Sequence, residues 1–479
     1  MVAVLREFLP EPSVLWHEEE TRPYECDGLT AYRHVPMVVA LPDTEQQVQR
    51  VLQTCHAMNV PVVPRGAGTG LSGGALPLGD GVLLSMAKFM RVVRIDPVAR
   101  VAVVQPGVRN AAISDVVAPF GLYYAPDPSS QIACSIGGNV AENSGGVHCL
   151  KYGLTVHNVL RVRGYTIDGA PIEFGSEALD TPGYDLLALV IGSEGLLAVI
   201  TEVTVKLLPK PQCARVIMAS FDDVEKAGNA VAAVIAAGIL PAGLEMMDKP
   251  ATRAVEEFVH AGYDLEAVAI LLCESDGSPE EVEDEIARMK AVLEASGATR
   301  LSVSRDEADR LRFWSGRKAA FGAMGRISPD YYCMDGTIPR KRLGEVLTFI
   351  AQMEKKYGLR CPNVFHAGDG NLHPLILFDA NDRGELERTE QFAAEVLEKC
   401  IEVGGTITGE HGVGVEKIDQ MCVQFGSEEL EVFHALKRAF DPKGLLNPGK
   451  AVPALSRCAE FGRMHVRGGK LSHPELPRF

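Results

Sequence analysis

The feature that most limits the possible folds of this chain is a glycine-dense loop, PRGAGTGLSGGALP, over residues 64–77. The chain enters it through an apolar run, MVVAL, an amphipathic helix and a second apolar run, VPVV, which together predict a β-α-β unit. Thr44 and Gln47 have the spacing of a capping box at the start of that helix. Three glycines of the loop match G-x-G-x-x-G, a pattern that predicts dinucleotide binding when it opens a helix.

The residues after this loop argue against a Rossmann fold. They read ALPLGDGV and break into turns before a strand, VLLS, whereas a Rossmann fingerprint opens a helix. We therefore predict that the loop is a nest of backbone N–H groups that binds a pyrophosphate without a helix. A glycine-rich surface loop with no ligand is the alternative interpretation.

A second glycine-rich segment, SIGGNVAENSGG, begins at Ser135 and has glycine pairs at 137–138 and 145–146. Its small and polar side chains offer little to pack with, so we expect its backbone to lie against a flat polar ligand, as one wall of a flavin pocket does. Farther along, IGSEG at 191–195 interrupts two β-rich runs. Within it, Glu194 is predicted equally well as a turn residue or as a cofactor contact.

The motif HAGDGNLH places two histidines around a turn. Apolar runs flank residues 368–371, which predicts a hairpin in which His366 faces His373 across the two strands. Side chains paired in this way lie about 5 Å apart at Cβ, so both imidazoles could bind one metal ion. Glu410, in the later motif TGEHGVG, is the candidate third ligand, and three ligands with an open position are typical of a catalytic metal site. Two surface histidines and an unrelated acid are the alternative.

Length, charge and cysteine spacing narrow the class of protein. A chain of 479 residues predicts two or three domains, and a net charge of -16 argues against a nucleic-acid surface. No leader pattern begins the chain and no apolar run approaches about 18 residues, so we expect a cytoplasmic protein without a direct membrane span. The 11 cysteines include no C-x-x-C pair, so any iron–sulfur cluster must belong to a partner.

Strands and helices alternate from Cys213 onward, which predicts a second domain of the α/β type. Helices are expected at 222–237, 249–261, 278–295, 341–357, 385–403 and 427–440. The basic residues beyond Pro453 could dock a partner, although a loosely packed terminus is the simpler expectation.

These motifs follow one another as in the FAD-linked oxidases of the vanillyl-alcohol oxidase type, and LLNPGK closes the series. Within that superfamily the chain resembles the D-2-hydroxy-acid dehydrogenases, above all the FAD-bearing subunit of bacterial glycolate oxidase. The resemblance implies an α+β fold. It would comprise a two-lobed PCMH-type FAD-binding domain over 1–212, an α/β substrate-binding cap over 213–440, and a C-terminal segment, 441–479, that returns to the FAD domain and ends in a basic tail.

The resemblance implies noncovalent FAD, because the first loop has Thr69 near the place where some relatives carry a histidine attached to the flavin. The residues that it assigns to the cofactor are Pro64, Arg65, Gly66, Gly68, Thr69, Gly70, Ser72, Gly73, Gly74, Pro128, Ser129, Ser135, Gly137, Gly138, Asn143, Gly145, Gly146, Glu194, Gly195, Ile200 and Asn447.

For the reaction, the resemblance implies that His366, His373 and Glu410 hold one divalent metal, Zn or Mn, and that His411 is the general base. Arg317 is implied to orient the substrate carboxylate, against the alternative of an ordinary arginine on a helix surface. Relatives that oxidise D-2-hydroxyglutarate have a Lys and an Asn where this chain has Cys333 and Leu375. Both departures remove polar groups for a second carboxylate and favour a small monocarboxylate.

The predicted function is FAD- and metal-dependent oxidation of a small D-2-hydroxy acid, glycolate first, then D-lactate and then D-2-hydroxyglutarate. Expected partners are an iron–sulfur subunit and a second flavin-type subunit, with membrane association only through them. The electron acceptor is expected to be such a partner or a quinone-linked acceptor, with oxygen as the weaker alternative. Two rival classes are a non-catalytic FAD-binding subunit, which would lack the histidine set, and a metallohydrolase, which would leave the glycine-rich half unexplained.

Overall fold

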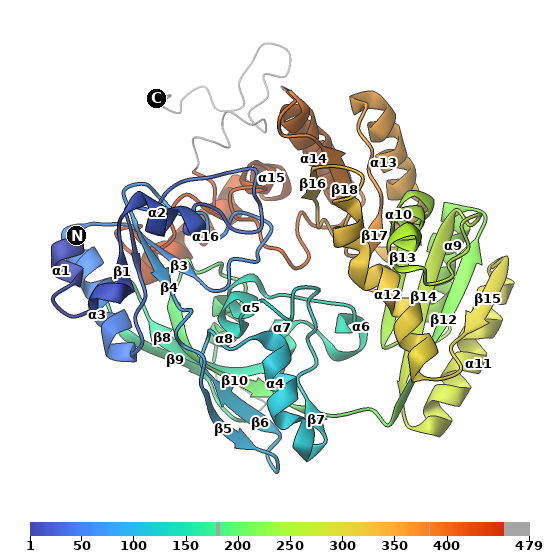
Figure 1. Cartoon of the computed structure of the whole chain (residues 1–479), viewed down its shortest axis with the longest axis horizontal. Coiled ribbons are helices and arrows are strands. Elements are labelled where there is room, and N and C mark those ends of the chain that lie inside the picture. The colour runs from blue at the N-terminus through green and yellow to red at the C-terminus, as the bar shows by residue number, and fades with distance from the viewer. Residues whose placement is uncertain (179–182, 383, 455–479) are drawn as a thin grey trace.

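A computed structural model describes residues 1–178, 183–382 and 384–454. The chain forms two parts, one built on the first eleven strands and one on the strands that follow (Figure 1). The basic tail that the sequence predicts beyond Pro453 lies almost wholly outside the described residues. Within the described ranges, no helix combines the length and the apolar character needed to cross a bilayer.

The first sheet confirms the predicted β-α-β entry. Its order is β1 (Val14–Leu15), β2 (Val38–Ala40), β4 (Val82–Ser85) and β3 (Val62–Arg65), with β2 and β3 both parallel to β4. The helix between β2 and β3 is α3 (Glu45–Met58), and the Thr44 side chain accepts a hydrogen bond from the backbone N–H of Gln47. The apolar face of α3 is buried against this sheet.

The second sheet is antiparallel and forms the other lobe of the first part. Its order is β5 (Val92–Asp96), β6 (Val101–Val104), β10 (Val199–Lys206), β8 (Val159–Tyr165) and β9 (Pro171–Gly175). A short ribbon pairs β7 (Leu122–Tyr123) with β11 (Leu208–Pro209). The remaining helices of this part are α1 (Val2–Leu5), α2 (Glu18–Thr21), α4 (Asn110–Val117), α5 (Ile136–Glu142), α6 (Cys149–Tyr152), α7 (Thr155–Asn158) and α8 (Leu186–Val190).

The cap is built on an antiparallel sheet covered by helices. Its order is β15 (Arg300–Val303), β12 (Cys213–Phe221), β14 (Ala269–Gly277), β13 (Gly243–Asp248) and β17 (Val364–Phe365), and a ribbon pairs β16 (Asp330–Cys333) with β18 (Leu375–Phe378). The cap helices are α9 (Val224–Ala236), α10 (Lys249–Val259), α11 (Pro279–Ala295), α12 (Glu307–Met324), α13 (Leu343–Tyr357), α14 (Glu385–Glu402), α15 (Ile418–Gln424) and α16 (Ser427–Phe440). All six helices predicted for this half are present, whereas α12 and α15 were not predicted.

After α16 the chain returns to the first part, as expected. The backbone of Val62 in β3 donates to Leu445 (2.8 Å) and accepts from Asn447 (2.7 Å), so LLNPGK lies beside the first sheet. Figure 1 shows α15 and α16 next to the N-terminal elements. The two-domain α+β architecture is therefore as predicted, while the boundaries at 212/213 and 440/441 stay predictions.

The predicted hairpin register around HAGDGNLH is wrong by two residues. His366 is bridged to Asn371 rather than to His373, and residues 367–370 form the turn. The Asp369 carboxylate accepts from the Asn371 backbone N–H (3.0 Å), and this local bond stabilises the shifted turn. The flanking runs pair mainly with other strands, β17 with β13 and β18 with β16. A register shift of two residues leaves each side chain on the same side of the strand pair. The two histidines are therefore diagonal neighbours across the strands, with ring centroids 5.1 Å apart.

Candidate active site

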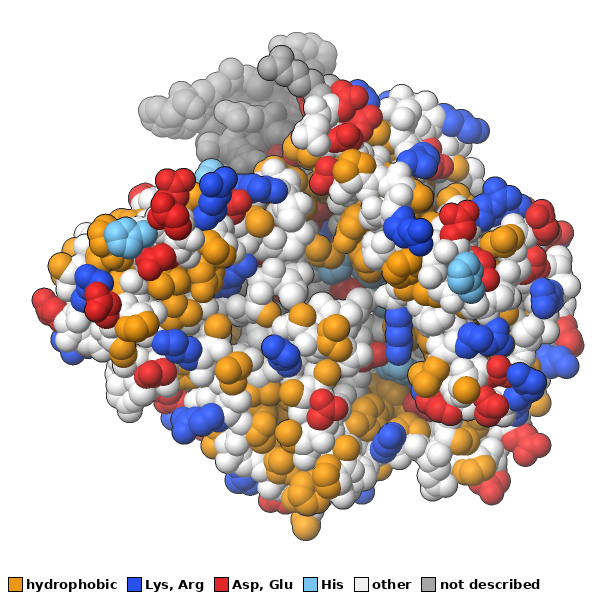
Figure 2. Space-filling view, in the orientation of Figure 1, with side chains coloured by type: hydrophobic (Ala, Val, Ile, Leu, Met, Phe, Trp, Pro, Cys, Tyr) orange, Lys and Arg blue, Asp and Glu red, His pale blue; other side chains and the backbone are white. Residues whose placement is uncertain are grey.

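A cavity of about 390 Å³ runs between the two lobes of the first part and reaches the cap. The space-filling view shows a hollow between the two parts of the molecule with histidine side chains at its floor (Figure 2). Its walls come from the glycine-rich loop, from α5 and the residues before it, from the 190–200 segment, and from cap residues that include His373, Glu410 and His411. The two glycine-rich motifs and the histidine motifs therefore meet in one place.

Fifteen of the 21 residues predicted to bind the cofactor line this cavity. They are Pro64, Arg65, Gly66, Gly68, Thr69, Gly70, Gly74, Pro128, Ser129, Ser135, Gly137, Gly138, Glu194, Gly195 and Ile200. No helix follows the loop before β4, which agrees with the rejection of a Rossmann fold. At Gly68, φ is +71° and an added Cβ would lie 2.2 Å from the Arg65 guanidinium, so only glycine fits there.

The other six do not line this cavity, although some of them hold segments that do. They are Ser72, Gly73, Asn143, Gly145, Gly146 and Asn447. The Ser72 hydroxyl donates to the His411 carbonyl (2.9 Å), and the Asn447 amide donates to the carbonyls of Gly74 (3.0 Å) and Glu194 (2.7 Å). An added Cβ on Gly145 would lie 2.6 Å from Oε2 of Glu410, so this glycine admits the carboxylate. Their direct contact with a cofactor stays a prediction.

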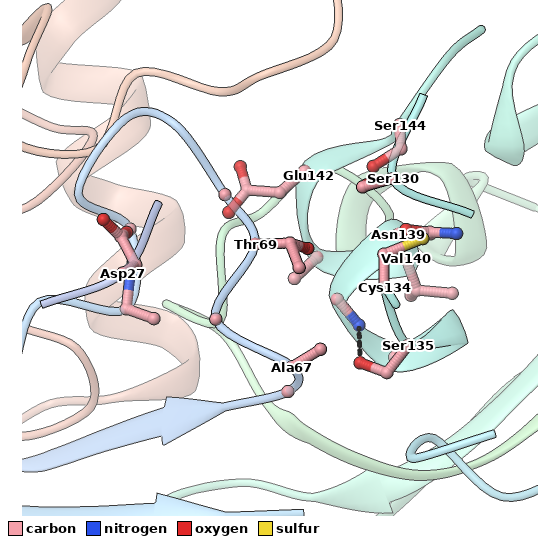
Figure 3. Close-up of a pocket in the computed structure, with 18 of the residues that line it drawn as sticks. Asp27, Ala67, Thr69, Ser130, Cys134, Ser135, Asn139, Val140, Glu142 and Ser144 are labelled. Atoms are coloured by element: carbon pink, nitrogen blue, oxygen red, sulfur yellow. Dashed lines mark hydrogen bonds between the residues drawn. The ribbon is translucent and has the colours of Figure 1, made fainter. Parts of the chain in front are cut away.

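The segment that was expected to form one wall of a flavin pocket contains a helix, α5, which the sequence analysis did not predict. The Ser135 hydroxyl accepts from the Gly138 N–H (3.4 Å) and caps the helix, as Figure 3 shows. Glycine disfavours helices, but an added Cβ at Gly137 would lie 2.5 Å from Pro106, so tertiary packing requires glycine there. A serine at the N-cap position predicts the start of a helix, but the two glycines that follow, which disfavour helices, argued against that prediction.

The three predicted metal ligands form one buried cluster. Ligand atoms of His366, His373 and Glu410 all lie within 4.8 Å of one another. Oε1 of Glu410 is 3.1 Å from Nε2 of His373 and 3.4 Å from Nε2 of His366. Nε2 of His366 and both ring nitrogens of His373 are buried without a hydrogen-bond partner. Such orphaned imidazole nitrogens around a carboxylate are what a divalent metal would satisfy.

Glu245, which the sequence analysis did not single out, orients this cluster from behind. Its Oε1 lies 2.7 Å from Nδ1 of His366, and its Oε2 accepts from Nε of Arg317 (2.7 Å). Burial alone would lower the pKa of His366, but the neighbouring carboxylates, Glu245 first, raise it well above its usual value. A carboxylate on the far nitrogen of a ligand histidine is a common outer partner of metal sites.

The structure places Arg317 behind the histidines rather than on the cavity wall. It is almost fully buried, although its Nη2 atom has no partner. The next residue, Lys318, lines the cavity together with Phe321 and Tyr331. A direct grip of Arg317 on a carboxylate therefore stays a prediction, and Lys318 is a second candidate for that role.

His411 lies beside the metal cluster on the cavity wall. Its ring stacks on that of His373 at 5.0 Å between centroids, and its Nε2 is 3.8 Å from Oε1 of Glu410. Burial lowers the pKa of His411, and the charge of Lys417 acts in the same direction, against the opposing carboxylates of Asp335 and Glu410. The imidazole is therefore neutral near pH 7 and able to accept a proton.

Asp335 holds the backbone of the loop that carries Glu410 and His411. Its Oδ2 accepts from the N–H groups of residues 409, 410 and 411 at 3.0, 2.8 and 2.7 Å, and its Oδ1 pairs with Lys417. Both partners of that ion pair are fully buried. Burial would raise the pKa of Asp335, but Lys417 and these donors lower it. Neither residue was predicted as functional, because they are separated by 82 positions in the sequence.

Glu194 fixes the other end of the same loop. Its two carboxylate oxygens accept from the N–H groups of Val413 and Gly414, both at 2.7 Å. It is also a turn residue, with φ of +51°, and it lines the cavity. Both interpretations left open by the sequence thus agree with its position.

A buried polar cluster joins the cap to the first part. The His148 ring lies between Asp127 (2.7 Å from Nδ1) and Glu274 of β14 (3.1 Å from Nε2), and Glu274 also pairs with Arg310 of α12 (2.8 Å). Nearby, the Lys151 ammonium and the Tyr152 hydroxyl donate to Asp276 at 2.6 and 2.7 Å. These contacts fix α12, which carries Arg317 and Lys318, over the cavity.

The fold and the cavity define a two-domain FAD-dependent oxidoreductase, and comparison with known proteins agrees. A model described as "FAD binding domain" matches residues 36–175, and one described as "FAD linked oxidases, C-terminal domain" matches residues 210–451. The chain therefore belongs to the family of FAD-linked oxidases.

Individual proteins in this family are similar over most of their length. Glycolate oxidase subunit GlcD of Escherichia coli is 63% identical over 479 residues, which is 100% of this chain and 96% of that protein. D-lactate dehydrogenase of Archaeoglobus fulgidus is 33% identical over 451 residues, or 93% and 97% of the two chains. The solved structure of 4-ethylphenol oxidase from Gulosibacter chungangensis superposes with a TM-score of 0.80 at 17% identity, covering 95% of this chain and 97% of that one. The last likeness concerns the fold alone.

Proposed function

We propose that this protein oxidises glycolate to glyoxylate in an FAD- and metal-dependent reaction. The observation that carries the proposal is that His373, Glu410 and His411 line one cavity with the glycine-rich FAD-binding walls, and that His366 completes the cluster behind them. Identity of 63% to a glycolate oxidase subunit supports glycolate as the substrate. D-lactate is the second candidate, because a D-lactate dehydrogenase is 33% identical to the chain.

The residues present fit the two groups that this reaction needs, FAD and a divalent metal ion. Glycine backbone and small side chains line the cavity where the flavin would lie, and the loop has no histidine for a covalent link. The buried, unpartnered nitrogens of His366 and His373 beside the Glu410 carboxylate suit a divalent ion such as Zn or Mn. When bound, FAD supplies the hydride acceptor, and the metal supplies a Lewis acid that lowers the pKa of the substrate hydroxyl.

The protein groups then divide the remaining tasks. Nε2 of His411, 3.8 Å from Oε1 of Glu410, is placed to take the hydroxyl proton. Glu245 keeps Nδ1 of His366 occupied, which directs Nε2 of that ring toward the metal cluster. Lys318, or Nη2 of Arg317, offers a positive charge for the substrate carboxylate.

The structure gives a different reason for a small substrate from the one that the sequence suggested. Cys333 and Leu375 are cross-strand partners buried in the cap core and do not line the cavity. Alternate side chains of a strand face opposite sides, and these two face the core. Beside Lys318, the cap lines the cavity with Phe321 and Tyr331, whose rings lie 5.8 Å apart, so the wall next to that lysine is aromatic and favours a small substrate.

We further propose that electrons leave the flavin for partner subunits. Iron–sulfur ligation requires clustered cysteines, and this chain has no C-x-x-C pair. An iron–sulfur subunit and a second flavin-type subunit would complete such an enzyme, and they would provide any membrane contact. The word "subunit" in the name of the Escherichia coli relative supports a partner in general terms.

Anaerobic reduction of the bound flavin tests the substrate. Glycolate, both lactate enantiomers and D-2-hydroxyglutarate are mixed in turn with the FAD-loaded protein, and flavin absorbance is followed before and after chelation of metal. We expect the fastest bleaching with glycolate, slower bleaching with D-lactate and loss of both after chelation. Fast reduction by D-2-hydroxyglutarate alone would overturn the proposal. Absence of flavin absorbance bands after reconstitution with FAD would instead favour the metallohydrolase alternative.

Replacing Glu245 with Gln should weaken metal binding by about 10–100-fold, the usual effect of losing an outer partner of a ligand histidine. The Gln side chain keeps the shape but removes the negative charge next to Nδ1 of His366. Metal affinity is measured by competition with a chelator, and FAD content reports whether the fold is retained. His34→Gln on the exposed surface is the matched control, and unchanged metal affinity in Glu245→Gln would contradict the assignment.

A further inference from the structure

The side chain of Glu142 is a buried carboxyl group with no part in the assignments above. It is the last residue of α5, and Figure 3 shows it directed from that helix toward the glycine-rich loop. It lines the main cavity and also a second cavity of about 500 Å³ on the other side of Glu410. The group therefore stands in the partition between the two cavities.

Two glycines make room for this carboxyl group. An added Cβ on Gly74, in the glycine-rich loop, would lie 2.8 Å from its Oε1. An added Cβ on Gly412, in the loop that carries Glu410, would lie 2.1 Å from its Oε2. Both distances are shorter than any normal contact, so each loop has glycine at the point where it passes the carboxyl. Glu142 thus packs between the predicted pyrophosphate loop and the metal loop.

The neighbouring Glu194 decides which of two carboxyl groups is charged. The added Cβ on Gly412 would lie 3.0 Å from Oε1 of Glu194, so the two carboxyl groups flank the same glycine. Glu194 accepts two backbone N–H bonds, whereas Oε2 of Glu142 is buried with no partner. Neighbouring carboxylates disfavour each other's charged form, and burial raises the pKa of Glu194 as well, but its two N–H donors favour its charged form over that of Glu142.

The surrounding charges agree with this division. Burial and then the charge of Glu194 raise the pKa of Glu142 well above its usual value, Asp27 and Asp335 add to the increase, and Lys417 opposes it. The raised pKa favours the protonated form of Glu142, in which the side chain offers an O–H donor. A buried donor or acceptor without a partner is destabilising, so a ligand in the cavity is expected to complete its bonding.

We propose that Glu142 donates a hydrogen bond to the isoalloxazine ring of bound FAD and thereby raises the reduction potential of the flavin. Residues of the pyrophosphate loop and of the metal loop both line the cavity that would hold FAD, and Glu142 packs between those two loops. A reduced flavin gains negative charge, which a neutral O–H donor stabilises without repelling it. The proposal rests on FAD binding and is independent of which hydroxy acid is oxidised.

Reduction potentials of three variants test it without any substrate. Glu142→Leu and Glu142→Met remove the donor, while Glu142→Gln keeps an N–H donor of similar shape. Potentials are measured by anaerobic reductive titration against reference dyes. Loss of one hydrogen bond to a charged acceptor should shift the equilibrium constant for two-electron reduction about tenfold toward oxidised flavin, which lowers the potential by about 30 mV. Glu142→Gln should stay near wild type.

Glu387 on the exposed face of α14 provides matched controls, Glu387→Gln and Glu387→Leu, with unchanged potentials expected. If leucine prevents FAD loading, the unbranched methionine variant supplies the same comparison. Wild-type potentials in both donor-free variants would overturn the proposal. A higher potential in Glu142→Gln would also overturn it, because it would show that a negative charge had been removed. A change in KM for glycolate with unchanged potential would assign Glu142 to the substrate instead.

Discussion

Replacing His411 with Ala should slow reduction of the flavin by glycolate about 10²–10⁴-fold, the usual contribution of a general base. FAD should remain bound, because the Ser72 hydroxyl and Asp335 hold the His411 backbone through its carbonyl oxygen and its N–H rather than through its side chain. The rate is measured by anaerobic stopped-flow mixing with glycolate, and FAD content by absorbance. His34→Ala, on the exposed surface, is the control.

The pH profile gives an independent check of the same role. Burial lowers the pKa of His411 below its usual value, and a base acts only when it is neutral. The wild-type rate should therefore be full above this pKa and fall as the pH falls through it. The alanine variant should lack this acidic limb. A variant that reduces at the wild-type rate would remove His411 from the mechanism.

Replacing Asp335 with Asn should lower the free energy of unfolding by about 3–5 kcal/mol, because it leaves the buried Lys417 ammonium without its anionic partner. The loop that carries Glu410 and His411 should loosen as well, since three of its N–H groups bond to this carboxylate. The free energy of unfolding is measured by chemical denaturation. Loss of bound metal reports whether the loop has loosened.

A double variant and a surface control sharpen this test. Asp335→Asn with Lys417→Met removes both charges and should recover part of the loss, whereas Asp80→Asn on the surface should change stability by less than about 0.5 kcal/mol. The pKa of Asp335 is lowered in the folded protein, so its contribution is complete above the unfolded value of about 3.9 and is lost as the pH falls through the folded pKa. The difference between wild type and variant should therefore be full at pH 7. A stable Asp335→Asn protein would contradict the role of the pair.

Local patterns in the sequence predicted much of the fold. The β-α-β entry, the Thr44 cap and the long cap helices depend on periodicity and capping within a few residues. The histidine cluster was also predicted, although from a wrong register. A short turn cannot reveal that its flanking strands pair with β13 and β16, far away in the sequence.

What the sequence did not predict depends on contacts between distant residues. The ion pair of Asp335 with Lys417 was not predicted, and neither was the contact of Glu245 with His366 and Arg317, because Asp335, Lys417 and Glu245 look unremarkable in isolation. The short helix α5 has two glycines in its first turn, and the first of them, Gly137, is explained only by its packing against Pro106. Single-residue patterns carry no information about such partners.

The two hydrogen bonds of Glu194 have a consequence for how the holoenzyme assembles. This one carboxylate belongs to the wall of the FAD cavity and also holds residues 413 and 414, next to Glu410 and His411. Ordering the wall around the cofactor should therefore also order the metal ligands. By thermodynamic reciprocity, whatever factor FAD adds to metal affinity, metal must add to FAD affinity. The two cofactors are then expected to bind cooperatively. Each should bind more weakly to apoprotein that holds neither than to protein that already holds the other.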